Sequence, residues 1–325
     1  MRDVDVFRER LRQSFFPAVP VPFRQDGTID RLAQESYSRY LAGQPVTGVA
    51  VWAHTGRGLF LTSEQREYVY WSWREAIGND RPIICGVGSR VSPGTAADAE
   101  KLFLQQAMEM AEQARNLGAD ALLVYPPTFY RGTIGQEEKI IAYHRMIAGL
   151  GVPVILFYLY EAAGGITYSP AVLQELFALP QVAGIKMATL DSVMTYQDVA
   201  NLIRRDYPAV KLITGEDRML GYTIALGADG ALVGLGAACP GPQVAMLKAF
   251  GEERYEEFVR LMLQVDRLAE CTFVHPMEGY IQRMLYILTL QGVIPAGAAY
   301  DPFGPGITEA ERSHIRETLQ DLNLL

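Results

Sequence analysis

Lys186 is the residue of this chain best placed to act as a nucleophile. It ends the apolar run 182–185 and directly precedes a loop. If the run is a strand of a parallel barrel, its carboxyl end opens into the catalytic mouth, where apolar walls strip water from the amine, lower its pKa and free its lone pair. A second apolar run carries Tyr158, 28 residues earlier. The alternative is a lysine that only ends a strand and extends into solvent.

Eight short apolar segments alternate with stretches of helical character over most of the chain. This alternation is typical of repeated strand-and-helix units, and eight units predict an α/β protein with a (β/α)8 TIM barrel. The predicted strands are residues 15–21, 48–53, 83–86, 121–125, 154–158, 182–186, 211–214 and 231–233.

The pattern changes after residue 242, where only helical segments follow. The helices predicted there are 243–269, 278–291 and 309–322. Thr308 is the expected N-cap of the last one. We therefore predict a barrel catalytic domain over 1–242 and a C-terminal helical segment over 243–325 that packs on it. A long helix is expected at 95–117, entered through a loop that shapes a substrate or subunit contact or only lengthens the surface.

Composition limits the partners of this protein. Lys and Arg number 29 against 37 Asp and Glu, and the resulting net charge of −8 argues against nucleic acid. The charged start has no apolar stretch behind it and no apolar run is long enough to cross a bilayer, so we expect a cytoplasmic protein without membrane contact. The three cysteines are widely spaced, and His54 alone among four histidines lies at a strand end, so we expect no metal and no cofactor.

Short motifs at the predicted strand ends form a consistent set. Residues 20–30 read P-V-P-F-R-Q-D-G-T-I-D, residues 53–57 read A-H-T-G-R, and residues 184–186 read G-I-K. They are similar to the T-P-F-x-x-D-G-x-I-D, G-T-T-G-E and G-I-K motifs of the pyruvate-dependent class I aldolases and lyases. That family includes dihydrodipicolinate synthase, N-acetylneuraminate lyase and 2-keto-3-deoxy sugar-acid aldolases and dehydratases. The resemblance covers most of the chain.

The resemblance implies a covalent role for Lys186. Attack of its amine on the ketone of an α-keto acid such as pyruvate gives an imine, which withdraws electrons so that a neighbouring carbon loses a proton or a carbon fragment. Tyr158 is predicted to carry the protons, because a phenol can do so although its free pKa is about 10. The family's tyrosine normally lies four residues after the strand's proline, which gives Phe157 here, so we predict a one-residue bulge in or before this strand. Tyr160 is the reserve candidate, on the face of Tyr158 if the strand continues.

Substrate-binding roles are predicted for His54, Thr55 and Gly56. Thr55 stands where the resemblance puts the Thr or Ser that binds the keto acid's carboxylate, and Gly56 lets the backbone approach closely. His54 replaces a Thr or Ser and is a hydrogen-bond donor, a second acid or base, or a polar filler. Arg57 replaces a glutamate, and we expect it to change a structural contact more than chemistry. The turn 234–236 is a phosphate site or only a tight turn.

Two further loops bear on the substrate. In the synthase and the lyase, a tyrosine after the fourth strand reaches across a subunit contact. Here the aligned positions are Thr128 and Phe129, so this tyrosine is either missing or displaced to Tyr130. A homotetramer is expected by resemblance. Synthases hold a second carboxylate with an arginine in the loop that here spans 161–165, which has Glu161 and no arginine. Glu161 suits hydroxyls or a cation if it faces the pocket. We therefore predict an aldolase or dehydratase acting on pyruvate or a 2-keto-3-deoxy acid. The alternatives are dihydrodipicolinate synthase proper and a non-catalytic keto-acid-binding barrel.

Overall fold

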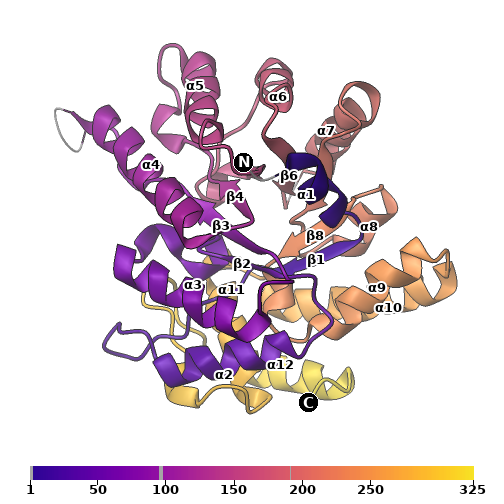
Figure 1. The fold of residues 1–325 in the computed structure, drawn as a ribbon. Coiled ribbons are helices and arrows are strands. Elements are labelled where there is room, and N and C mark those ends of the chain that lie inside the picture. The colour runs from indigo at the N-terminus through magenta and orange to yellow at the C-terminus, as the bar shows by residue number, and fades with distance from the viewer. Residues whose placement is uncertain (1–2, 95–97, 191) are drawn as a thin grey trace.

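The computed structural model describes residues 3–94, 98–190 and 192–325. Eight parallel strands form a ring with helices around it, so the predicted (β/α)8 barrel is confirmed (Figure 1). The order of hydrogen-bonded strands is β1-β8-β7-β6-β5-β4-β3-β2, and its two ends meet at a bridge between Ala18 and Ala50. The strands are β1 (Ser14–Pro17), β2 (Val49–Val51), β3 (Ile83–Val87), β4 (Ala121–Val124), β5 (Val154–Leu159), β6 (Val182–Ala188), β7 (Lys211–Thr214) and β8 (Gly230–Val233).

Helices connect successive strands and cover the outside of the ring. Local sequence sets several of their ends: Asp30 caps the helix after β1, Thr62 and Gln65 form a capping box, and Gly118 ends a long helix at a φ of +100°. These helices are α2 (Arg31–Ala42), α3 (Ser63–Ile77), α4 (Ala99–Leu117), α5 (Gln136–Ala148), α6 (Pro170–Phe177), α7 (Val193–Asp206), α8 (Leu220–Ala225) and α9 (Pro240–Gly251). The first residues of the helix predicted from 95, and residues 1–2 of the charged start, lie outside the described part.

The C-terminal part differs from the prediction in one place. The single helix that the pattern predicts over 243–269 is two helices, because α9 ends and Glu253 adopts a left-handed φ of +58° before α10 (Tyr255–Thr272) begins. The short turn η6 (Met277–Gly279) then leads into α11 (Tyr280–Leu290). Helix α12 (Glu309–Asp321) starts after Thr308, whose side chain accepts from the Glu311 N–H as an N-cap should. The division into domains at residue 242 stays a prediction.

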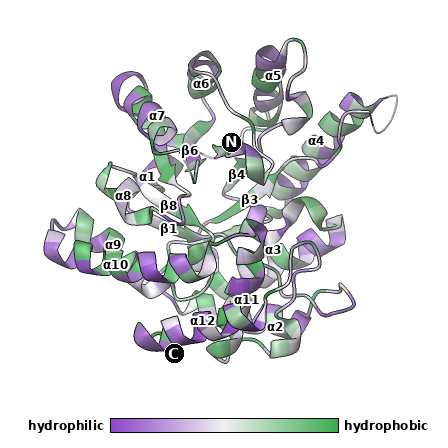
Figure 2. Ribbon diagram, turned by 180° about the vertical axis from the view of Figure 1, so that it is seen from behind, coloured by the Kyte–Doolittle hydropathy of each residue, from purple (hydrophilic) through white to green (hydrophobic). Residues whose placement is uncertain are grey.

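Apolar side chains form two clusters, one inside the ring and one between the ring and the helices. The inner cluster contains Phe16, Leu123 and Phe157, and α1 (Val4–Arg10) adds Phe7 to it. Figure 2 shows hydrophobic residues along the strands and mixed hydropathy on the surrounding helices. The ring is therefore a packed core whose strand ends carry the polar groups.

No helix in the described part is long and apolar enough to cross a membrane.

Strand β6 departs from regular alternation. The residues on either side of Ala183 pair with consecutive residues of β5, Val154 and Ile155, so Ala183 is an extra residue in β6. As a result Ala183 and Lys186 both face the inside of the ring, whereas Ile185 packs against the helices. A bulge therefore exists in this pair of strands. The sequence predicts it in or before β5, and that position is wrong because the extra residue lies in β6.

Candidate active site

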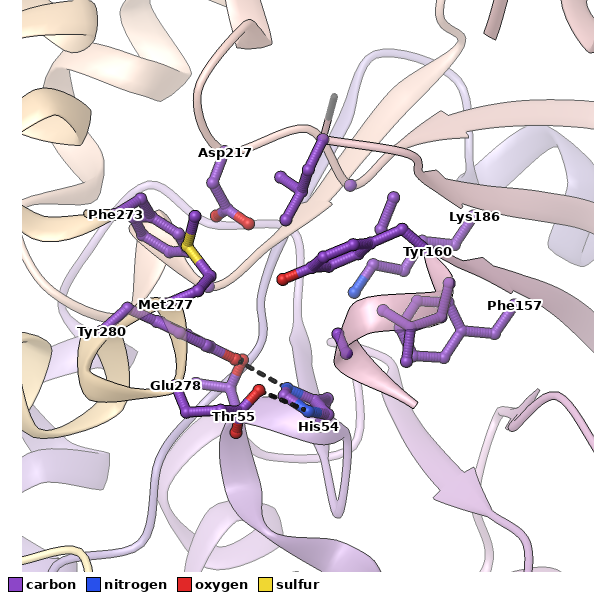
Figure 3. A pocket seen from close by; sticks show the side chains of 16 residues that line it. His54, Thr55, Phe157, Tyr160, Lys186, Asp217, Phe273, Met277, Glu278 and Tyr280 are labelled. Atoms are coloured by element: carbon purple, nitrogen blue, oxygen red, sulfur yellow. Dashed lines mark hydrogen bonds and ion pairs between the residues drawn. The ribbon is translucent and has the colours of Figure 1, made fainter. Parts of the chain in front are cut away.

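A pocket opens at the carboxyl ends of the strands (Figure 3). Its cavity volume is about 40 Å³, more than the roughly 10–15 Å³ that one water molecule needs by the same measure. Residues from five strand ends and from the C-terminal part form its wall. They are His54, Thr55, Phe157, Leu159, Tyr160, Ala163, Lys186, Ala188, Leu190, Gly215, Asp217, Gly234, Phe273, Met277, Glu278 and Tyr280.

Lys186 projects from β6 into this pocket. The residue is 5% exposed, and its Nζ lies 4.3 Å from the centroid of the Phe157 ring. Burial lowers the pKa of Lys186 to about 8, although the charges of Asp217 and Glu216 oppose that shift. A fraction of the amine is therefore unprotonated near neutral pH, as a nucleophilic amine requires.

Gly215, directly after β7, makes room for the lysine. A Cβ at this position would come within 2.5 Å of Lys186 Cε and 2.9 Å of the Met187 carbonyl oxygen. Because the carbonyl belongs to the backbone of β6, only the lysine side chain can move away. Glycine here is therefore a condition for the lysine to point at the cavity.

Asp217 places a carboxylate in the same pocket. It accepts a hydrogen bond of 2.7 Å from the Leu235 N–H. Burial raises the pKa of Asp217 to about 6, while the N–H groups of Leu235 and Gly234 and the charge of Lys186 favour its ionised form. The N–H groups of Gly234 and Leu235 therefore donate to a carboxylate of the protein itself. This favours the tight turn over a phosphate site at residues 234–236.

Glu216, next in the chain, holds the loop that follows Lys186. Its carboxylate accepts from the Thr189 N–H at 2.5 Å, the Thr189 hydroxyl at 2.7 Å and the Leu190 N–H at 2.8 Å. Burial raises the pKa of Glu216 to about 7 against these donors. Leu190 lines the pocket, so Glu216 shapes the wall without facing the cavity.

The structure does not bring Tyr158 to the amine. Pairing of β5 with β6 sets Phe157 opposite Lys186 and Tyr158 opposite Met187. Tyr158 therefore faces the helices outside the ring, where its ring centroid lies 5.6 Å from that of Tyr168 in an edge-on contact. The expected position of Tyr158 is wrong because a spacing of 28 residues does not account for the extra residue in β6.

Tyr160, the reserve candidate, reaches the pocket instead. Strand β5 ends at Leu159, and Tyr160 precedes the turn η4 (Glu161–Ala163), so strand alternation stops and its side chain turns inward. Its hydroxyl points into the cavity that Lys186 and Asp217 line (Figure 3). The sequence predicts a shared face for Tyr158 and Tyr160 only if the strand continues, and β5 ends at Leu159, before Tyr160.

The predicted binding residues after β2 divide into two groups. His54 and Thr55, in the turn η1 (His54–Gly56), line the pocket. Gly56 does not: a Cβ there would lie 2.8 Å from the Val19 carbonyl oxygen, so this glycine permits close contact between two backbone segments and not with a ligand.

The structure places neither Tyr130 nor Glu161 at the site. Tyr130 is 2% exposed and its ring packs against Phe103 and Phe129, so it is enclosed within its own chain. A reach across a subunit contact through Tyr130 therefore has no structural support. Glu161 accepts a 2.9 Å hydrogen bond from the Thr167 hydroxyl and lies outside the pocket wall.

Four pocket residues come from a part of the chain that the sequence pattern assigns only to packing. They are Phe273, Met277, Glu278 and Tyr280, between the end of α10 and the start of α11. Tyr280 is 7% exposed, and its ring stacks on Phe273 with 4.5 Å between centroids. No strand-end spacing marks these residues, so the sequence carries no local signal for them.

Arg57 anchors this C-terminal segment to the barrel. It is 5% exposed, with Nη1 2.6 Å from Glu278 and Nη2 2.7 Å from Asp301, which is itself 2% exposed. Burial alone would lower the pKa of Arg57, but the two carboxylates raise it above its ordinary value. One buried guanidinium therefore ties the end of η1 to two distant parts of the chain.

Comparisons with known proteins agree with this arrangement. The model of the dihydrodipicolinate synthetase family matches residues 12–322. An uncharacterized DapA-like lyase of Thermococcus kodakarensis is 28% identical over 255 residues, which cover 78% of this chain and 81% of that protein. Among solved structures, dihydrodipicolinate synthase from Oceanobacillus iheyensis has a TM-score of 0.81 at 22% identity, covering 99% of this chain and 100% of that chain. N-acetylneuraminate lyase from Fusobacterium nucleatum has a TM-score of 0.79 at 21% identity, covering 96% and 99%. These two likenesses show a shared fold.

Proposed function

The chain belongs to the dihydrodipicolinate synthetase family and is a lyase of that family, and we propose that it forms a Schiff base with pyruvate or a 2-keto-3-deoxy acid through Lys186. The observation that carries the proposal is a buried lysine with a lowered pKa, aimed into a pocket at the carboxyl ends of barrel strands. An amine in that setting is a nucleophile suited to a ketone carbon.

In the proposed reaction the amine of Lys186 attacks the ketone and loses water to give the imine. Carbinolamine formation and dehydration both move protons, and we assign this transfer to Tyr160, whose hydroxyl points into the same cavity. His54 and Thr55 line the same cavity and are our choice to contact the keto acid. The enamine that follows is common to aldolases and dehydratases, so the proposal covers both reactions.

We expect borohydride reduction in the presence of pyruvate to label Lys186. The rate of labelling should rise with pH up to about 8 and then level, because the neutral amine reacts. Mass mapping of the reduced protein checks the site, and Lys211 is an internal control: it is 3% exposed in the adjacent strand but pairs with Asp229 outside the pocket. Labelling of another lysine, or of none, would show that the proposed mechanism is wrong.

The second substrate is expected to be an uncharged aldehyde, which is either added to pyruvate or released from a 2-keto-3-deoxy acid. None of the described residues that line the pocket is an arginine, while Asp217 and Glu278 are acidic. Two nearby arginines are already engaged, Arg57 by its carboxylates and Arg131 by the Gly165 carbonyl. A carboxylate on the aldehyde would therefore meet repulsion without a partner.

We predict that kcat/KM with pyruvate and glyceraldehyde exceeds that with pyruvate and aspartate semialdehyde by about tenfold or more. Pyruvate consumption in a coupled assay measures both. Asp217→Asn should reduce the ratio of the two kcat/KM values, because it removes one of the charges that repel the carboxylate of aspartate semialdehyde. Efficient turnover of aspartate semialdehyde by the unaltered enzyme would instead support a dihydrodipicolinate synthase.

A further inference from the structure

Four side chains form one hydrogen-bonded series along the pocket wall. The Tyr280 hydroxyl lies 2.9 Å from Thr55 Oγ1 and 3.1 Å from His54 Nδ1 (Figure 3). On the other side of the imidazole, Nε2 lies 3.3 Å from Glu278 Oε1. All four residues line the pocket that holds Lys186. The series is complete only where the C-terminal segment folds over the barrel mouth.

Glu278 sets the direction of these hydrogen bonds. Burial alone would raise the pKa of Glu278, but its hydrogen bonds with His54 and Arg57 and the charge of Arg57 lower it to about 2, so the carboxylate only accepts. When the imidazole of His54 carries a single proton, that proton therefore lies on Nε2, which faces Glu278, and Nδ1 accepts from the Tyr280 hydroxyl. The Tyr280 oxygen in turn accepts from the Thr55 hydroxyl. Thr55 is left with an oxygen lone pair to accept a proton from the pocket.

Tyr280 can transmit a proton without becoming ionised. Burial holds the pKa of Tyr280 well above its ordinary value, so a phenolate is disfavoured. Its hydroxyl has a donor on one side and an acceptor on the other, and it can accept one proton while it gives up another. The residue opposite Lys186 in the neighbouring strand, Phe157, has no exchangeable proton and cannot serve instead.

We propose that Thr55, Tyr280 and His54, with Glu278 behind them, are a proton relay for the carbon next to the imine. The proposal rests on the Schiff-base function above. In the iminium formed by pyruvate and Lys186, a methyl C–H bond breaks, its electron pair becomes the C=C bond of the enamine, and the C=N pair returns to nitrogen. The proton goes to Thr55, whose own proton passes to Tyr280, while the Tyr280 proton passes to His54 Nδ1.

Charge balances in this transfer. The positive charge leaves the iminium and ends on the imidazolium of His54, beside the carboxylate of Glu278, in the way that a carboxylate supports the histidine of a catalytic triad. The reverse transfers return a proton to the enamine carbon. The relay can therefore both remove the proton from the methyl carbon and return it to the enamine, with residues of one chain.

Exchange of the pyruvate methyl protons in heavy water, followed by NMR, measures this step apart from imine formation. We expect Tyr280→Phe to slow the exchange about 100-fold. Borohydride labelling of Lys186 and the KM for pyruvate should change by less than about threefold, because the ring still stacks on Phe273. The matched control is Tyr286→Phe in the same helix, whose hydroxyl accepts from Arg316 and does not line the pocket.

A second pair of variants tests the hydroxyl of Thr55. Thr55→Ser keeps a donor and acceptor and should retain exchange, whereas Thr55→Val keeps the shape and should lose it. Unaltered exchange in Tyr280→Phe, with Lys186 still labelled, overturns the relay. So does an equal loss of exchange and labelling, which would mean that Tyr280 only shapes the pocket. Failure to label Lys186 in the unaltered enzyme overturns the Schiff-base function, and the relay with it.

Discussion

Lys186→Met is expected to abolish turnover and at the same time to make the folded protein more stable. Loss of the nucleophile removes a covalent path that binding contacts cannot replace, so kcat should fall by several orders of magnitude. The buried amine also carries a cost, because its pKa falls from 10.5 to about 8 in the folded protein. A shift of that size corresponds to about 3 kcal/mol. Methionine removes this cost but leaves Asp217 without a cation, so the free energy of unfolding should rise by about 1 to 3 kcal/mol at neutral pH.

The pH dependence of this gain has a definite sign. Because the folded-state pKa lies below the unfolded value, the cost is fully present below about pH 8 and disappears as the pH rises to 10.5. The two proteins should therefore converge in stability across that window, as urea unfolding at several pH values would show. Lys211→Met is the control, since it breaks an ion pair with Asp229 and should lower stability. A less stable Lys186→Met at neutral pH, or one that retains turnover, would contradict the prediction.

Arg57→Met is expected to destabilise the protein by about 3 to 5 kcal/mol, the range for a buried ion pair that loses one partner. Asp301 is 2% exposed and would be left without a cation. Activity should fall as well, because Glu278 would lose a contact that fixes the C-terminal segment at the pocket. Urea unfolding measures the first effect and the coupled pyruvate assay the second.

Two variants show whether the loss of stability in Arg57→Met comes from the unpaired buried charge of Asp301 or from the substitution of any ion-paired arginine. Arg57→Met combined with Asp301→Leu removes both buried charges and should recover much of the stability but not the activity, since Glu278 stays unanchored. Arg24→Met breaks an ion pair with Asp30 in which the arginine is 53% exposed, and it should cost less than about 1 kcal/mol. A loss of stability in Arg57→Met no larger than in Arg24→Met would show that the anchor is not energetically important.

The sequence predicts the barrel because parallel strands buried on both faces appear as short apolar runs. All eight predicted runs overlap the observed strands, and the segment 211–214 coincides with β7. Lys186 is correctly placed in the sixth strand, but β6 continues to Ala188, so residues 187 and 188 belong to the strand and not to the predicted loop. His54 and Thr55 are found because they follow the predicted run 48–53, although β2 itself ends at Val51.

The remaining errors have two physical causes. A strand that is apolar on both faces does not reveal which residues point inward, so the effect of Ala183 on the register, and with it the misplacement of Tyr158, cannot be seen in the sequence. The other cause is distance along the chain. Tyr280 lies 226 residues from the histidine that it contacts, and such a pairing depends on how the C-terminal helices pack on the barrel.

The extra residue in β6 has a consequence for how such an enzyme can arise or be redesigned. Inserting one residue before a strand-end lysine moves its amine from the helix side of a barrel to the cavity side without altering any side chain. Conversely, deletion of Ala183 would turn the amine of Lys186 toward the helices and bring an apolar neighbour into the cavity. Whether Lys186 can react thus depends on the number of residues before it in the strand. The insertion or deletion of one codon can gain or lose the nucleophile although the lysine itself is still present in the sequence.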